Sequence, residues 1–155
     1  MPELLRDNGY DTAAMHAYKK GFWNRDQVYQ NLCFDHFFSK KDYPDQEEIG
    51  MALNDKQFLT TSIEHMETLK EPYFSFLAAL TSHTPYEIPK DKWELDLSGY
   101  DDPMLKRYYQ TVHYVGEAVG QMGKELKAKD MWDETLVIFY GVHDSALTNE
   151  GSEIQ

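Results

Sequence analysis

Two short runs of almost wholly apolar residues set the strongest limit on the fold of this chain. Residues 73–80 read YFSFLAAL and residues 135–140 read TLVIFY. Runs of this length without alternating polar residues are typical of strands covered on both faces, as in parallel sheets. A third candidate strand, residues 10–16, reads YDTAAMH. We expect these three strands to lie in one sheet.

Helical patterns separate the candidate strands. Asn54 and Gln57 resemble a capping box that opens a helix ending near residue 69. Asp102 and Pro103 open a longer helix, to about residue 129, whose apolar residues keep the three-and-four spacing of one buried face. This alternation predicts an α/β fold, with a mainly parallel sheet and helices on both faces.

Length and charge narrow the class of protein. The chain has 155 residues, enough for one domain with a core and too few for two. It has 15 basic and 27 acidic residues, a net charge of −12, so we expect no nucleic-acid partner, although a few placed residues could still bind an anion. The single cysteine excludes an intrachain disulfide and a thiolate metal cluster. We also expect no membrane span and no targeting signal within these residues.

A histidine follows each of the three candidate strands. His16 ends the first, His83 comes shortly after the second, and His143 comes after the third. Because ligand sites in parallel sheets gather beyond the carboxyl ends of the strands, these histidines predict a site at one edge. For His83, followed by Thr84 and Pro85, two interpretations stay open. The stiff turn could aim the imidazole into the site, or the histidine could cap a backbone group.

Two polar stretches carry further candidate site residues. In WNRD, Arg25 offers a planar fork for phosphate and Trp23 a flat apolar wall. The same stretch is also typical of a helix start, with Asp26 near the positive end of the helix dipole. In YGVHDS, His143 and Asp144 carry donor atoms suited to zinc, manganese or magnesium. Two ligands are too few to define a metal site, so the others would have to come from elsewhere in the fold.

Five segments, taken in order, resemble one known family. They are AAMHAYKKGFWNRDQVY (13–29), LNDKQFLTTSI (53–63), FSFLAALTSHTPYEIP (74–89), YYQTVHYVGEAV (108–119) and LVIFYGVHDS (136–145). Together they resemble the extracellular catalytic domain of lipoteichoic acid synthases and related phosphoglycerol transferases, within the sulfatase and alkaline-phosphatase-like superfamily. The resemblance covers nearly the whole chain.

This resemblance implies a metal-dependent phosphoglycerol transferase of the cell envelope that acts on a glycerophosphate lipid or polymer. In the family, a threonine activated by a divalent metal, usually Mn²⁺ or Mg²⁺, passes the phosphoglycerol group through a covalent intermediate to an acceptor chain. On matching positions, His16, Trp23 and Arg25 would grip the glycerophosphate. His83 would contact the phosphoryl oxygens, and His143 would bind the metal. The parent protein would be membrane-anchored, with this domain on the extracellular face of a bacterial cytoplasmic membrane.

Two departures from the family pattern change what we expect of this chain. The family's motif is Tyr-Gly-Asp-His, and Val142 replaces its metal-binding aspartate, which leaves Asp144 as a candidate substitute. The segment with the threonine nucleophile lies outside residues 1–155. We therefore expect these residues to be part of a sulfatase-like catalytic domain, with the nucleophile segment upstream and a C-terminal remainder absent, and to be inactive alone. Two alternatives stay open: a non-catalytic relative that binds glycerophosphate or another anion, and a structural fragment without activity.

Overall fold

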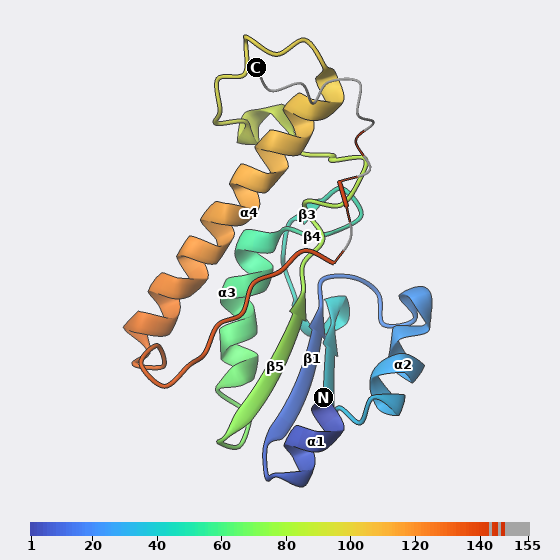
Figure 1. The fold of residues 1–155 in the computed structure, drawn as a ribbon, viewed down its shortest axis with the longest axis vertical. Coiled ribbons are helices and arrows are strands. Elements are labelled where there is room, and N and C mark those ends of the chain that lie inside the picture. Colours follow the sequence, from blue (N-terminus) through green and yellow to red (C-terminus); the bar gives the residue numbers. More distant parts are fainter. Residues whose placement is uncertain (143, 146, 148–155) are drawn as a thin grey trace.

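Helices and strands alternate along the chain, as the sequence predicts for an α/β fold (Figure 1). The structure, a computed structural model, describes residues 1–142, 144–145 and 147. The elements, in chain order, are α1 (Pro2–Asp7), β1 (Asp11–His16), the short helix η1 (Phe22–Asn24), α2 (Arg25–Asn31), β2 (His36–Ser39), η2 (Lys40–Asp42), β3 (Glu48–Ile49), β4 (Ala52–Leu53), α3 (Asp55–Met66), β5 (Tyr73–Ala78), η3 (Lys90–Lys92) and α4 (Pro103–Ala128). None of these helices has the length and apolarity that crossing a membrane requires.

The main sheet is parallel and has β1 at its centre. Within the described residues its strand order is β2-β1-β5, and β3 and β4 form a separate antiparallel pair. β1 pairs in parallel with both neighbours, so that His16 lies opposite Ser39 on one side and Ala78 on the other. The carboxyl ends of the three strands therefore meet at one edge. The two predicted strands at residues 10–16 and 73–80 are confirmed, in one parallel sheet.

Helices cover both faces of this sheet. Side chains of β1 point alternately to the two faces. On one face, Ala13 and Met15 join a buried apolar cluster with Phe58 of α3, and α4 lies on the same side (Figure 1). On the other face, the buried Tyr29 of α2 packs edge-on against Phe37 of β2, with ring centroids 4.8 Å apart. The predicted arrangement of layers is confirmed.

The two long helices begin at the residues that the sequence predicts. The side chain of Asn54 accepts a hydrogen bond from the backbone N–H of Gln57 at 3.0 Å, which caps α3. The carboxylate of Asp102 accepts one from the backbone N–H of Met104 at 2.7 Å, which caps α4. Each cap satisfies a backbone donor that the first turn of a helix leaves unpaired.

Residues 135–140 are where the sequence prediction is wrong. The sequence predicts a buried strand, but the structure has no strand there, and Leu136, Ile138 and Phe139 are 85%, 71% and 66% exposed. Strand-forming side chains set only a preference, because a strand forms only where its backbone N–H and C=O groups hydrogen-bond to a neighbouring strand. After α4 the chain turns instead, and the backbone N–H of Thr135 donates to the carbonyl of Trp132.

Candidate functional site

His16 ends the central strand and is completely buried. Burial disfavours the charged imidazolium, and the nearby Arg25 guanidinium repels it, so the pKa of His16 falls from 6.5 to about 4 against a smaller opposite effect of the Tyr18 backbone. The imidazole is therefore neutral at physiological pH. The Tyr18 backbone lies near the ring, but neither ring nitrogen makes a hydrogen bond of ordinary length and angle to a described residue.

Arg25 begins α2, next to this histidine. Its Nη1 donates a hydrogen bond to the hydroxyl of Tyr29 at 2.6 Å, and its Nε is buried with no hydrogen-bond partner among the described residues. The guanidinium carbon lies 5.8 Å from the ring centroids of both Trp23 and Tyr29, within cation–π range. Arg25 and His16 therefore bring together buried nitrogen atoms whose capacity for hydrogen bonds is unmet.

Trp23 reaches Arg25 through an unusual backbone conformation. Trp23 and Asn24 have φ of 52° and 56°, in the left-handed region that non-glycine residues seldom occupy. This turn places the Trp23 ring, which is 67% exposed, parallel to the ring of Phe22 at 5.1 Å. The predicted helix start is confirmed, since α2 begins at Arg25 with Asp26 in its first turn. The exposed Trp23 ring therefore lies directly before the helix start, next to Arg25.

The loop after β5 carries His83 and is anchored to the start of α3. The carboxylate of Asp55 accepts hydrogen bonds from the backbone N–H groups of Leu80, at 3.1 Å, and Thr81, at 3.2 Å. In return, the Thr81 hydroxyl accepts one from the backbone N–H of Asp55 at 3.0 Å. Burial raises the pKa of Asp55 to about 6, although these hydrogen bonds oppose the rise.

His83 itself is half-buried, and its Nδ1 lies 2.7 Å from the carbonyl oxygen of Thr84. Because a carbonyl oxygen only accepts, Nδ1 carries the proton in this contact. This contact is the second of the two interpretations of His83 that the sequence left open, in which the histidine caps a backbone group. It also defines the orientation of the ring at the edge where β1 and β5 end.

Two residues that follow residue 139, Tyr140 and Ser145, lie near Tyr29 of α2 and Tyr86 of the His83 loop. Tyr140 lies close enough to Tyr29 to add to the rise that burial causes in the pKa of Tyr29. Further on, the Tyr86 hydroxyl donates a hydrogen bond to the Ser145 carbonyl, and Asp144 adds to a rise in the pKa of Tyr86 that is again mainly due to burial. Tyr140 therefore lies near α2, and Ser145 contacts the loop that holds His83.

The expected metal site does not fit the described residues of this segment. Val142 is 74% exposed and has no donor atom, and Asp144 supplies one exposed carboxylate. His143 lies outside the described residues. One carboxylate is far short of the roughly 4–6 ligands that divalent metals take.

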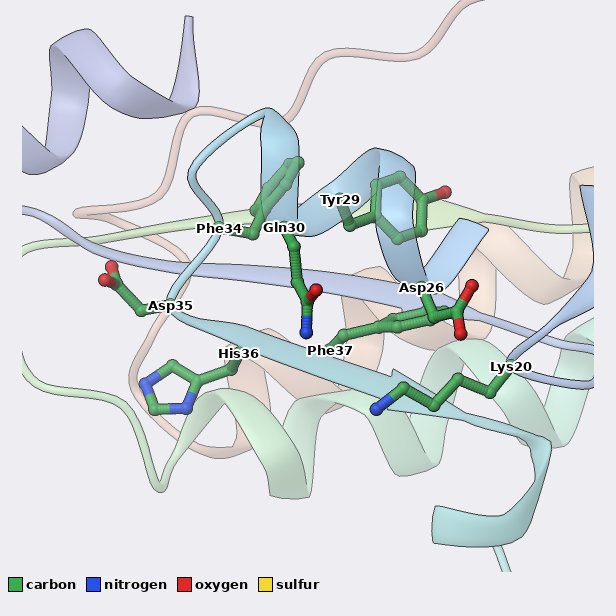
Figure 2. A pocket seen from close by; sticks show the side chains of 8 residues that line it. All are labelled: Lys20, Asp26, Tyr29, Gln30, Phe34, Asp35, His36 and Phe37. Carbon is green, nitrogen blue, oxygen red and sulfur yellow. The ribbon is translucent and has the colours of Figure 1, made fainter. Parts of the chain in front are cut away.

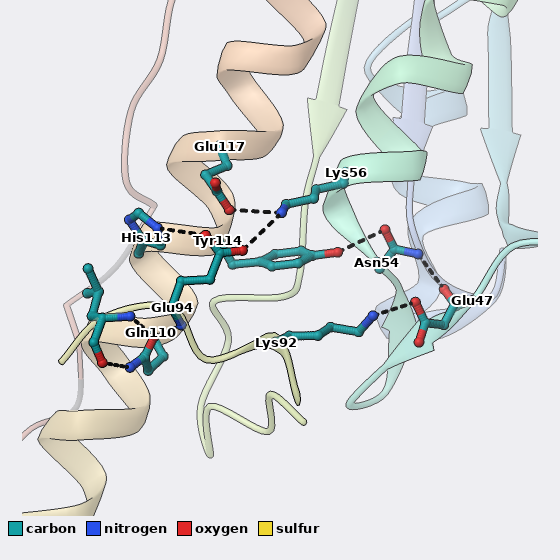
Figure 3. A network of polar contacts seen from close by, with 10 residues as sticks. Glu47, Asn54, Lys56, Lys92, Glu94, Gln110, His113, Tyr114 and Glu117 are labelled. Carbon is teal, nitrogen blue, oxygen red and sulfur yellow. Dashed lines mark hydrogen bonds and ion pairs between the residues drawn. The ribbon is translucent and has the colours of Figure 1, made fainter. Parts of the chain in front are cut away.

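A second group of candidate metal ligands lies on α4 and on the loop before it, and Lys56 of α3 contacts this group (Figure 3). One ligand atom from each of Glu94, His113 and Glu117 lies within 4.8 Å of the others. The Lys56 ammonium is 2.8 Å from a carboxylate oxygen of Glu117 and 3.9 Å from one of Glu94, and its hydrogen bond lowers the pKa of Glu117. Because Lys56 already pairs with both carboxylates, most closely with that of Glu117, the group is best described as an ion-pair network.

A pocket of about 140 Å³ lies between α2 and β2 (Figure 2). Its lining residues are Lys20, Asp26, Tyr29, Gln30, Phe34, Asp35, His36 and Phe37. His16, Trp23, Arg25 and His83 are not among them. With two carboxylates against one lysine, this pocket is poorly suited to an anion.

Sequence reasoning missed two residues that support the site. Tyr29 stands four residues after Arg25, a spacing that brings side chains together on a helix and could have suggested the contact. Asp55 follows the helix cap Asn54 directly, and its place in a helix start gives no sign of its partners. The Asp55 carboxylate binds the backbone of Thr81, 26 residues away, a contact that only the fold creates.

Comparisons with known proteins agree on one family. The sequence model of the sulfatase family matches residues 1–154. The chain is similar to lipoteichoic acid synthase 1 of Bacillus subtilis (strain 168), with 37% identity over 152 residues that make up 96% of this chain and 24% of that protein. It is also similar to the lipoteichoic acid synthase of Staphylococcus aureus (strain USA300), with 30% identity over 158 aligned residues, 100% of this chain and 24% of that protein.

A solved structure agrees with this similarity. The crystal structure of the lipoteichoic acid synthase LtaP from Listeria monocytogenes matches the fold with a TM-score of 0.76 and 33% sequence identity. The match covers 85% of this chain and 33% of that chain. The present chain thus spans about a quarter of the length of the curated relatives that it matches.

Proposed function

Since the chain belongs to the sulfatase family, we propose that it forms part of a metal-dependent phosphoglycerol transferase that acts on a glycerophosphate lipid or polymer. Similarity to lipoteichoic acid synthases, which are proteins of the cell envelope, supports this assignment. We further propose that the whole enzyme is membrane-anchored and works on the extracellular face of a bacterial cytoplasmic membrane.

The observation that carries this proposal is the pairing of Arg25 with His16. The charge of the Arg25 guanidinium acts on a neutral imidazole, and Arg25 Nε and both nitrogens of His16 are buried and make no hydrogen bond of ordinary length and angle to a described residue. Buried polar groups are rarely left unpaired, because an unpaired group costs about 1–3 kcal/mol. Phosphate oxygens would meet this demand, and the planar guanidinium suits their geometry.

The role that we propose for these residues is to bind and orient the phosphoglycerol group. Arg25 supplies the positive charge, His16 a neutral hydrogen-bonding group, and Trp23 a flat wall beside the glycerol carbons. His83 would contact the phosphoryl oxygens from the anchored loop after β5. We assign no nucleophile to this chain.

The proposed cofactor of the whole enzyme is Mn²⁺ or Mg²⁺. When bound, such an ion lowers the pKa of a hydroxyl nucleophile and neutralises charge on the transferred group. His143, with Asp144 as a second candidate, is the ligand that we propose from this chain.

A non-catalytic, anion-binding relative is the alternative function, and Val142 favours it. An exposed valine stands where the family has a metal-binding aspartate, and it offers no lone pair. Such a protein would still bind an anion through Arg25 and His16, and it would lack transfer activity even at full length.

The test is a titration of the ¹⁵N-labelled chain with sn-glycerol-1-phosphate, followed by NMR. Arg25→Gln should weaken binding by about tenfold or more, because hydrogen bonds to charged groups contribute about 1.5–3 kcal/mol. Arg6→Gln is the matched control, because Arg6 is exposed on α1 and the change removes the same charge. Equal affinity of the two variants would contradict the proposal. Turnover of a glycerophosphate lipid by the 155-residue chain would contradict a role limited to binding.

A further inference from the structure

Tyr29 provides the hydrogen-bond acceptor that holds the Arg25 side chain. The two residues lie one turn apart on α2, and Arg25 Nη1 donates to the Tyr29 hydroxyl at 2.6 Å. The guanidinium also lies against the Tyr29 ring, 5.8 Å from its centroid. Tyr29 therefore constrains both the direction and the plane of the guanidinium.

The Tyr29 side chain is itself rigidly packed. It is 4% exposed, and its ring makes edge-on contacts with Phe34, Phe37 and Phe76 at centroid distances of 5.5, 4.8 and 6.3 Å. Phe37 and Phe76 belong to β2 and β5, the two neighbours of β1 in the main sheet. Through these contacts the sheet determines where the hydroxyl lies, and the hydroxyl determines where the guanidinium lies.

The chemistry of this acceptor suits a site for an anion. Burial raises the pKa of Tyr29, and this outweighs the lowering by Arg25, so the phenol stays neutral. A carboxylate in its place would also hold the guanidinium, but it would cancel the positive charge and repel a phosphate. The nearby Asp26 carboxylate accepts instead from the backbone N–H of Gln27 at 2.9 Å. A neutral phenol orients Arg25 and leaves its charge available.

We propose that Tyr29 is a positioning residue that presents the Arg25 guanidinium to the bound phosphate group without neutralising it. This inference rests on the proposed function, in which Arg25 binds the phosphate group. An arginine side chain has many rotamers, and a ligand that must immobilise it loses affinity. Because Tyr29 already holds the Arg25 side chain before the ligand binds, much of this loss of affinity is avoided.

The experiment compares two buried tyrosines that lose the same atom. Tyr29→Phe removes the acceptor and keeps the ring packing. Tyr43→Phe is the matched control, because Tyr43 is equally buried and its hydroxyl lies 2.9 Å from the hydroxyl of Ser62, between core residues. Two quantities are measured on the 155-residue chain: the heteronuclear NOE at Arg25 Nε, which reports side-chain motion, and the dissociation constants for inorganic phosphate and sn-glycerol-1-phosphate.

Tyr29→Phe should lower the NOE at Arg25 Nε and weaken the binding of both anions by about two- to tenfold. Tyr43→Phe should change neither quantity. An unchanged NOE in Tyr29→Phe, or an unchanged affinity despite a lower NOE, overturns the inference. If Arg25→Gln weakens binding and Tyr29→Phe does not, the inference fails alone. If the wild-type chain and Arg25→Gln bind phosphate equally, the proposed function fails and the inference fails with it.

Discussion

The pH dependence of stability tests the buried anchor beneath the His83 loop. Asp55 is completely buried, and its pKa rises from 3.8 to about 6 because burial outweighs its hydrogen bonds. A folded-state pKa above the unfolded value means that the folded state holds the proton more tightly. The resulting stability is fully present below pH 3.8 and is lost as the pH rises through about 6. The rise in pKa corresponds to about 3 kcal/mol.

His16 has the opposite effect over nearly the same range. Its folded-state pKa of about 4 lies below the unfolded value of 6.5. Its contribution is therefore present above pH 6.5 and is lost as the pH falls toward 4. This loss amounts to about 2–3 kcal/mol, so the effects of the two residues nearly cancel in the wild-type chain.

Asp55→Asn should remove the contribution of Asp55 and leave that of His16 without an opposing effect. Asparagine has nearly the same shape and keeps one oxygen for the backbone N–H groups of Leu80 and Thr81. Between pH 7 and pH 4, the free energy of unfolding of the variant should fall by about 2 kcal/mol relative to the wild type, because only the wild type takes up a proton at residue 55. Urea unfolding followed by circular dichroism, at one-unit steps of pH, measures this difference.

Asp7→Asn is the control for the general effect of charge. Asp7 is exposed on α1, and its substitution removes the same negative charge from a chain of net charge −12. Its unfolding free energy should follow the wild type across the pH range. If the Asp55→Asn curve also stays within about 1 kcal/mol of parallel to the wild type, the assignment of Asp55 as a buried titrating group is wrong.

Three further substitutions test other parts of the structure. Ile138→Ser should change the free energy of unfolding by no more than about 0.5 kcal/mol, because this side chain is exposed. Ile63→Ala in the core should cost about 2–5 kcal/mol. Equally large losses for both variants in urea unfolding would show that residues 135–140 are buried. Lys56→Met should cost up to about 1 kcal/mol, and the loss should shrink in about 0.5 M NaCl, because its contact with Glu117 is a partly exposed ion pair; a loss independent of salt would indicate packing instead. Val142→Asp should leave the affinity of the chain for Mn²⁺ almost unchanged in a calorimetric titration, since one added carboxylate still leaves too few ligands. A large gain would show that this chain already holds most of the metal site.

The sequence alone determined the local structure and the family. Residues 73–80 could be assigned as a strand because an almost wholly apolar run is typical of a strand in a parallel sheet. Asn54 and Asp102 could be assigned as helix caps, because their hydrogen bonds reach only two or three residues along the chain. Arg25 and His16 could be named as candidates because a helix start and a strand end are local features, and the motifs around them resemble one family.

The tertiary structure decided everything that depends on partners distant in sequence. Residues 135–140 have the composition of a strand, but a strand needs a paired neighbour, and the fold leaves this segment exposed. The unusual pKa of Asp55 arises from burial beside Thr81, and that of His16 from burial beside Arg25. The orientation of Arg25 depends on a Tyr29 ring that the main sheet holds in place. Burial and pairing are properties of the assembled chain, because they arise only when distant segments exclude water from one another.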